Sequence, residues 1–176
     1  RLESPDGPEV AVRVHPAMVP AQHPLGGVRD SFNAVFVEGR AVGELMFYGR
    51  GAGGDPTASA VLGDLVDAAV NVRKGAHATI GAAGRARIRP IDEQRSPFYL
   101  SLDVVDRPGV LRSIAEVFER HGVSIRSLEQ EGIEDDARIV LITHTAREAD
   151  LQATVTDLSD IPTVHRVGSV IRVVGD

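Results

Sequence analysis

The stretch FYLSLDVVDRPGVLRSIAEVFERHG, residues 98–122, changes its hydrophobic period halfway and so predicts a strand that leads into a helix. In residues 98–104 every second residue is apolar, the pattern of a strand with one buried face. Asp106-Arg-Pro-Gly109 makes a turn, and helical spacing then continues to the stop signal His121-Gly122. We expect the helix to bury five apolar residues: Val110, Leu111, Ile114, Val117 and Phe118.

The sequence that follows predicts two more strands, a second helix and a last strand. Residues 123–131 form a strand with a bulge expected after Ile125, and residues 138–145 are apolar on both faces, as in a central strand. Leu151, Val155 and Leu158 mark the second helix, and residues 164–174 the last strand. This βαββαβ order predicts a mixed α/β (α+β) fold, a ferredoxin-like sheet of four antiparallel strands with two helices on one face. Because the other face and the strand edges need cover, we expect such modules to pair.

The sequence upstream of this module predicts a β-hairpin followed by a helix. Residues 33–37 and 41–48 are apolar segments around a short connection at residues 38–40. A glycine-rich loop follows, after which Asp55 is the expected helix cap and Pro56 the first helical residue. The chain is therefore expected to have three parts: residues 1–72, a linker at 73–97 with a short strand around Ile88, and the module at 98–176.

Composition excludes several classes of partner. The net charge of −6 argues against nucleic acid, and no apolar run approaches the ~20 residues of a membrane helix. Without cysteine the chain has neither disulfides nor thiolate sites. This absence does not indicate a compartment, and the cytoplasm is expected by default. His15 and His23 each precede a proline without a nearby carboxylate pattern, so no metal site is expected. The acidic residues between Glu129 and Asp136 are interpreted as a solvated hairpin tip.

The glycine loop matches G-x-G-x-x-G through Gly49, Gly51 and Gly54. Such a loop lets a backbone approach a phosphate or a ring closely. A complete dinucleotide fingerprint also needs a second parallel strand that ends in an acidic residue, whereas this helix runs into the linker. The loop is therefore no complete Rossmann unit, and a simple tight turn is the alternative.

The turn before residue 110 suits a small amino acid. Free N–H groups at the helix start can hold a carboxylate, and Asp106 can attract an ammonium group. The alternative is that Asp106 only caps the helix and Gly109 only makes the turn.

Two stretches, VRVHPAMVP at residues 12–20 and GRGAGGDPTASAVLGD at residues 49–64, resemble homoserine dehydrogenase. That family reduces aspartate semialdehyde to homoserine with NADP or NAD as cofactor. The resemblance implies that Gly51 and Gly53 lie beside the nicotinamide. It also implies that the catalytic lysine, the substrate-binding acidic residues and the main fingerprint lie upstream of Arg1. We therefore expect no catalytic residue in this chain, no cofactor bound by it alone and no activity of its own.

The C-terminal module resembles the ACT domain of bacterial homoserine dehydrogenases. This implies feedback regulation by a small amino acid, expected to be L-threonine, in threonine and methionine biosynthesis, and a homo-oligomer formed through the ACT sheets. The loop reads Asp-Arg-Pro-Gly where some amino-acid-binding members have Asn or His first. The alternatives are a stand-alone small-molecule-binding module and a pure assembly module. The implied effector residues are four from the loop and two from a neighbouring module: Asp106, Gly109, Val110 and Leu111, with Ser124 and Ile125.

Overall fold

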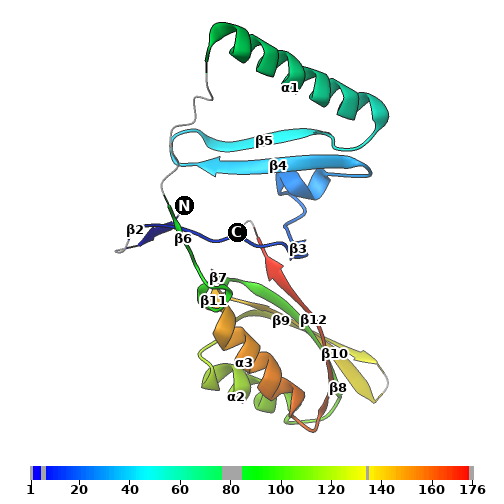
Figure 1. The fold of residues 1–176 in the computed structure, drawn as a ribbon. Coiled ribbons are helices and arrows are strands. Elements are labelled where there is room, and N and C mark those ends of the chain that lie inside the picture. Colours follow the sequence, from blue (N-terminus) through cyan, green and yellow to red (C-terminus); the bar gives the residue numbers. More distant parts are fainter. Residues whose placement is uncertain (1, 5–6, 77–84, 134, 175–176) are drawn as a thin grey trace. The chain divides into compact units, whose positions relative to one another are not determined.

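The computed structural model describes residues 2–4, 7–76, 85–133 and 135–174, and the chain divides into two compact units (Figure 1). The first unit comprises Arg1–Val19 and Arg85–Asp176, and the second comprises Pro20–Gly84. These units do not follow the linear division at residues 72 and 97, because the first residues of the chain pair with its last strand. The linear division stays a prediction about the regions of the family.

The first unit contains the predicted βαββαβ module. Its sheet has the order β12-β8-β10-β9 with every neighbouring pair antiparallel, and α2 and α3 lie on one face (Figure 1). The ferredoxin-like α+β prediction is therefore confirmed. In chain order the elements are β8 (Phe98–Val105), α2 (Val110–Arg120), β9 (Ile125–Ile133), β10 (Asp136–Thr143), α3 (Glu148–Ser159) and β12 (Val164–Val173).

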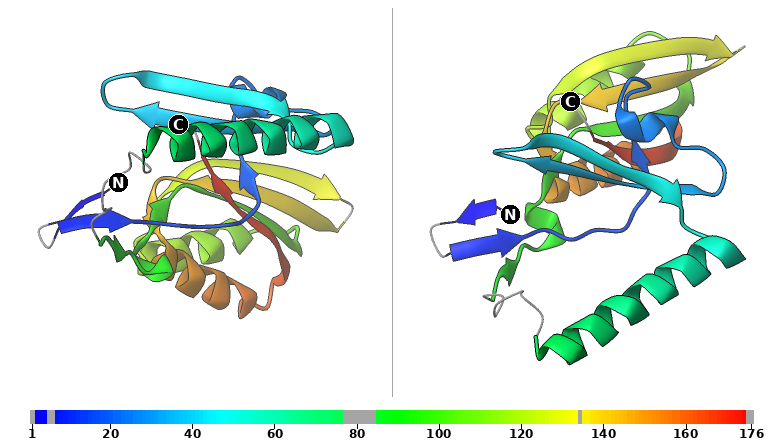
Figure 2. Two further views of the ribbon diagram at one scale, coloured as in Figure 1. Left: turned by 45° about the horizontal axis from the view of Figure 1, so that its top comes forward. Right: turned by 90° about the horizontal axis from the view of Figure 1, so that it is seen from above.

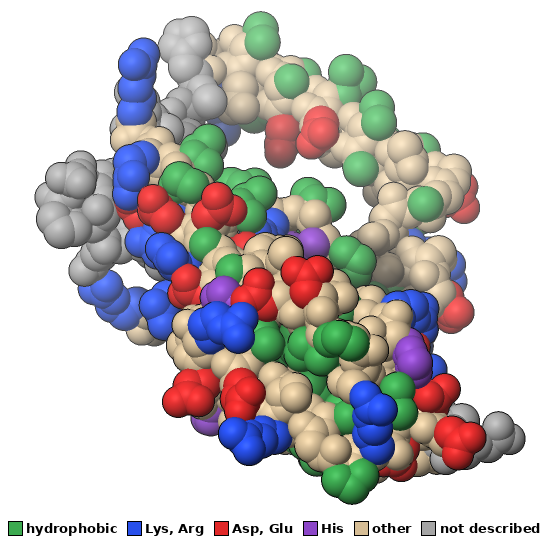
Figure 3. Space-filling model, turned by 90° about the horizontal axis from the view of Figure 1, so that it is seen from below, with side chains coloured by type: hydrophobic (Ala, Val, Ile, Leu, Met, Phe, Trp, Pro, Cys, Tyr) green, Lys and Arg blue, Asp and Glu red, His purple; other side chains and the backbone are tan. Residues whose placement is uncertain are grey.

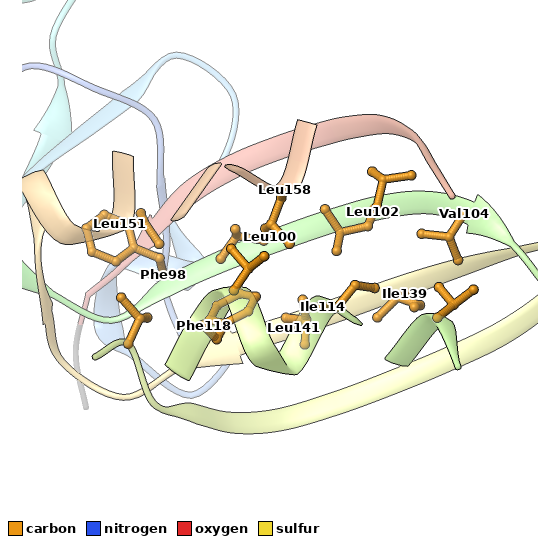
Figure 4. Close-up of a cluster of buried hydrophobic side chains, with 14 of the residues drawn as sticks. Phe98, Leu100, Leu102, Val104, Ile114, Phe118, Ile139, Leu141, Leu151 and Leu158 are labelled. Carbon is orange, nitrogen blue, oxygen red and sulfur yellow. The ribbon is translucent and has the colours of Figure 1, made fainter. Parts of the chain in front are cut away.

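The core of the module lies between the sheet and the two helices (Figure 4). Strand β8 alternates between buried and half-buried residues, as its period predicts. Each large aliphatic side chain in this layer stabilises the fold by about 1.5–3 kcal/mol relative to an exposed one. Ten of the core residues are labelled in Figure 4: Phe98, Leu100, Leu102, Val104, Ile114, Phe118, Ile139, Leu141, Leu151 and Leu158.

Three local predictions in the module can be compared with the structure. The bulge is confirmed, since Thr143 pairs with Ile125 and Ile142 with Ser127, which leaves Arg126 as the extra residue. Strand β10 is central, with β8 and β9 on its two sides. The expectation that Leu111 is buried is wrong. Its side chain is 43% exposed, because Val110 and Ile114 define the face of α2 that meets the sheet.

A fifth strand, which the sequence did not predict, extends the sheet. Strand β3 (Ala17–Met18) runs parallel to β12, with Ala17 opposite Arg172 and Met18 opposite Val173. The Val174 amide also donates to the Met18 carbonyl at 2.9 Å. The C-terminal end of the β12 edge is thereby covered, and β9 forms the other edge of the five-stranded sheet.

Short elements complete the first unit. The strand expected around Ile88 is present as β6 (Arg87–Ile88), but residues 77–84 of the predicted linker lie outside the described part of the chain. The remaining elements are β1 (Leu2–Ser4) and β2 (Gly7–Val10), which form a sheet with β6, the 3-10 helix η2 (Ile91–Glu93), and β7 (Arg95–Ser96), which pairs with β11 (Ala146–Arg147).

The second unit contains the 3-10 helix η1 (Pro24–Gly27), strands β4 (Phe32–Gly39) and β5 (Gly43–Arg50), and helix α1 (Gly54–Lys74). The hairpin of β4 and β5 is confirmed, but its connection lies at residues 40–42, two residues later than predicted.

Helix α1 begins differently from the prediction. Gly53 is the N-cap, with a φ of 124° that favours glycine, and no side chain caps the helix. Asp55 and Pro56 are therefore the second and third helical residues, and Asp55 is not the cap. Figure 2 shows α1 as one long straight helix. No helix in the described ranges is both long enough and apolar enough to cross a membrane.

Candidate functional site

A cavity of about 440 Å³ lies at the N-terminus of α2, where β8 ends. We call it the loop cavity. It is open to solvent, so the turn is not sealed against its own protein. Its lining comes from the end of β8, the turn, the start of α2 and two neighbouring strands: residues 104–111 with Gln130 and Ile139.

The turn leaves backbone donors at the start of α2. Gly109 is the N-cap, with a φ of 95°, and the Ser113 amide donates to its carbonyl at 3.1 Å. The Val110 amide reaches back to the Arg107 carbonyl at 3.4 Å. The amides of Leu111 and Arg112, which belong to the first turn, have no carbonyl one turn earlier in the helix to which they can donate. Two N–H groups and the positive end of the helix dipole thus suit a carboxylate.

Asp106 does not cap α2, so the cap alternative for this residue is wrong. The Gln130 side-chain amide donates to Oδ1 of the Asp106 carboxylate at 3.1 Å. The backbone amide of Asp106 donates to the Asp135 carbonyl at 2.9 Å. The carboxylate therefore points toward β9, at the wall of the loop cavity. Its position makes it available to an ammonium group.

The floor of the loop cavity is apolar. Val104, Val110 and Ile139 are buried, and Leu111 is partly exposed at the same cavity. A cavity with an apolar floor, amide donors and one carboxylate suits a small zwitterion with a short aliphatic side chain.

The structure brings only four of the six predicted effector residues together. Asp106, Gly109, Val110 and Leu111 line the loop cavity. Ile125 pairs with Thr143 at the start of β9, whereas the turn follows the other end of the sheet, where Asp136 pairs with both Val105 and Ile133. Within one chain, Ser124 and Ile125 are therefore remote from the turn.

Gln130 was not predicted, although the sequence contains a signal for it. It lies directly opposite Ile139 in the β9–β10 register, and residues opposite each other in a sheet share a face. If the hairpin register is drawn from the turn at Ile133, Gln130 falls on the face of the buried Ile139. Placing Gln130 requires the register between β9 and β10, which the sequence of neither strand specifies by itself.

Gly51 and Gly53 lie in the exposed loop between β5 and α1. A Cβ on Gly51 would lie 1.8 Å from the Asn33 side-chain amide nitrogen, so a larger residue here would displace the exposed Asn33 side chain. Asp55 places a negative charge in the first turn of α1, and Pro56 removes one amide donor. The start of α1 therefore suits a phosphate poorly, and the place of Gly51 and Gly53 beside a nicotinamide stays a prediction.

On one face of the molecule the charged side chains are mixed and not grouped by sign. On the face shown in Figure 3, acidic and basic groups alternate around apolar side chains. Within the described residues no group of three or more His, Asp and Glu side chains is placed to hold a metal ion. Glu134, part of the predicted acidic tip, lies outside those residues.

Comparison with known proteins identifies two regions along the sequence. Residues 3–66 match the family model of homoserine dehydrogenase, and residues 98–163 match that of the ACT domain. The homoserine dehydrogenase of Corynebacterium glutamicum is 48% identical over 169 residues, which are 95% of this chain. The chain belongs to the homoserine dehydrogenase family. It corresponds to the C-terminal region of those proteins, with its ACT domain.

A second relative and one solved structure agree with this assignment. The homoserine dehydrogenase of Mycobacterium tuberculosis strain H37Rv is 45% identical over 99% of the chain. The crystal structure of the homoserine dehydrogenase from Thiobacillus denitrificans superposes with a TM-score of 0.85 at 32% identity, over 93% of this chain and 39% of that one. The chain spans 38% of the Corynebacterium and 42% of the Mycobacterium relative.

Proposed function

We propose that this chain is the regulatory and cofactor-facing region of an NAD(P)-dependent homoserine dehydrogenase, and that its ACT domain binds L-threonine. The observation that carries the proposal is the loop cavity, in which free helix amides, a carboxylate and an apolar floor lie together. In the complete enzyme this region would adjust the reduction of aspartate semialdehyde in the cytoplasm.

Each group of threonine has a matching group in or beside the loop cavity. The amides of Leu111 and Arg112 receive the carboxylate, and Asp106 receives the ammonium. The methyl group meets the floor formed by Val104 and Ile139. The Gln130 amide, already bound to Asp106, holds that carboxylate in place.

Pairing of two ACT domains would complete the site. Strand β3 pairs with the C-terminal end of β12, whereas no described strand pairs with the outer side of β9, so we take the β9 edge as the one open to a second copy. Two β9 strands related by a two-fold axis run antiparallel, so the start of one lies beside the end of the other. This arrangement would carry Ser124 and Ile125 of one copy toward the turn of its partner. Leu111 and Leu128, both about two-fifths exposed, would be covered at such an interface.

The catalytic role is proposed for the whole enzyme. Gly51 and Gly53 would flank the nicotinamide, which supplies or accepts hydride when bound, and the two glycines would contribute only close backbone approach. Because the chain spans about two-fifths of its relatives, we expect no dehydrogenase turnover from it alone. The alternative is an assembly module whose loop cavity binds nothing.

Titration with L-threonine, followed by thermal unfolding and calorimetry, tests the proposal. Saturation at 100 times Kd should stabilise the ACT domain by about 2.7 kcal/mol, and D-threonine should do less. Asp106→Ala should abolish the response, whereas Asp92→Ala, an exposed acid in η2, should keep it. No response to any amino acid, with dimers retained, would favour the assembly alternative.

A further inference from the structure

A buried carboxylate fastens the N-terminal segment to the ACT domain. Glu148, the first residue of α3, accepts hydrogen bonds through Oε2 from Arg13 at 3.0 Å and from Arg172 of β12. The side chains of all three residues are at most 16% exposed. This cluster lies where β8 begins, at the other end of that strand from the loop cavity.

The cluster has more positive than negative charge. Burial opposes ionisation of Glu148, but hydrogen bonds from Arg172, Gln152 and Arg13 outweigh it and lower the pKa of the carboxyl. The carboxylate is therefore ionised near neutral pH, and two guanidinium groups face one anion. Its second oxygen, Oε1, is already bound by the Gln152 amide at 3.1 Å. One positive charge thus remains without a counter-ion inside the cluster.

An unused donor lies in the same cluster. The Nε–H of Arg13 is buried and has no hydrogen-bond acceptor within the described structure. An unmet buried donor costs free energy, and a charged one costs more. Next to it is a cavity of about 290 Å³ lined by Arg13, Arg172 and Glu148 itself, together with His15, Gln152 and several apolar residues. We call it the arginine cavity.

We propose that the arginine cavity binds a small oxyanion, either a phosphate or a carboxylate, between the guanidinium groups of Arg13 and Arg172. Planar guanidinium forks match the geometry of such anions. The Arg172 guanidinium also lies over the Phe98 ring, with its central carbon 5.3 Å from the ring centroid, which helps to hold it in place. The anion balances the remaining positive charge of the two guanidinium groups.

Occupation of this site has a structural consequence. The anion bridges Arg13, in the segment that leads to β3, and Arg172, in the strand that pairs with β3. It therefore adds to the attachment of residues 13–18 to the ACT domain. This role does not depend on threonine binding at the loop cavity.

Calorimetric titration of the whole chain with sodium phosphate, and separately with sodium acetate, tests the site and distinguishes the two sources. Chloride keeps the ionic strength constant, because salt screens exposed charges. Arg13→Gln should weaken binding about tenfold, the loss of one charge-assisted hydrogen bond. Glu148→Gln removes the competing charge at equal size and should tighten binding about tenfold. Arg138→Gln, which affects an arginine paired with Asp103 elsewhere on the sheet, should change nothing.

The opposite effects of the two variants separate a binding site from a structural ion cluster. If Arg13 and Glu148 only hold the fold together, both substitutions lower the melting temperature and neither changes the anion response. That result, or no heat with either anion, would overturn the proposal. If Arg13→Gln does not fold, Arg13→Lys keeps the charge without the guanidinium fork and should also weaken binding.

Discussion

The ACT domain and the second unit have opposite relations to solvent. In the ACT domain, sixteen apolar residues are at most 8% exposed and form one core. In the second unit, no described residue is buried, and the apolar residues along α1 between Val61 and Val70 are 36–65% exposed. Both regions have clear helical periods, yet only one of them builds a core from its own residues.

The difference shows that an amphipathic pattern predicts a buried face but does not predict which segment covers that face. The apolar stripe on α1 is broader and less sharply one-sided than that on α2, and no described residue of its own unit buries it. An exposed apolar surface of this extent marks an interaction site. Because the chain spans about two-fifths of its relatives, we interpret the stripe as a face that the rest of the enzyme covers.

Preparing the two regions as separate fragments should give the largest difference, which is in how cooperatively they unfold. Residues 85–176 should unfold in one cooperative transition in urea, because they carry the whole apolar core. Residues 20–76 should show no cooperative transition by circular dichroism, since they bury no side chain. A monomeric 20–76 fragment that unfolds cooperatively would contradict the comparison.

A matched pair of leucine substitutions tests the same difference between the ACT domain and the second unit. Leu102→Ala, at a position with 0% exposure, should lower the free energy of unfolding of the whole chain by about 2–5 kcal/mol. Leu65→Ala, at 65% exposure on α1, should change it by no more than about 0.5 kcal/mol. Equal losses in urea titrations would mean that α1 is packed in this chain.

Two glycines provide the next contrast. Gly109 has a φ of 95°, so Gly109→Ala should destabilise the ACT domain by about 1–2 kcal/mol. Gly63 lies within α1, and open space surrounds the position of its missing Cβ. Gly63→Ala should therefore stabilise that helix by about 0.5–1 kcal/mol. Thermal unfolding and helix content by circular dichroism measure both, and a stabilised Gly109→Ala would show that the turn is not strained.

The smallest effect should be on the stability of the ACT domain at acidic pH. The pKa of Glu148 is lowered from its ordinary value of 4.5 in the folded chain, so the unfolded chain binds more protons as the pH falls. Its contribution is present above about pH 4.5 and is lost as the pH falls through the lowered pKa. In Glu148→Gln the stability of the ACT domain should depend less on pH below 4.5. The control Glu116→Gln, in an exposed pair with Arg112, should lower the free energy of unfolding by about 0.3–0.5 kcal/mol.

Much of the fold was predictable because it follows from local periods of apolar residues. The alternation in residues 98–104, the helical spacing after Val110 and the apolar strand at 138–145 each specify an element without reference to distant residues. The turn at Asp106-Arg-Pro-Gly109 likewise identified the loop cavity. The cap at Asp55 was mispredicted because Gly53 can take a backbone conformation that starts the helix earlier.

The sequence by itself thus determined the βαββαβ order, the hairpin, and the turn that opens onto the loop cavity, because residues close in the chain decide those features. Only the tertiary structure decided that β3 pairs with β12 and that Gln130 holds Asp106. The tertiary structure also decided that Glu148 lies buried between two arginines, one of them 135 residues away in the sequence. Each of these contacts joins segments whose local patterns are independent, so the pairing is fixed by the geometry of the folded sheet and not by either partner.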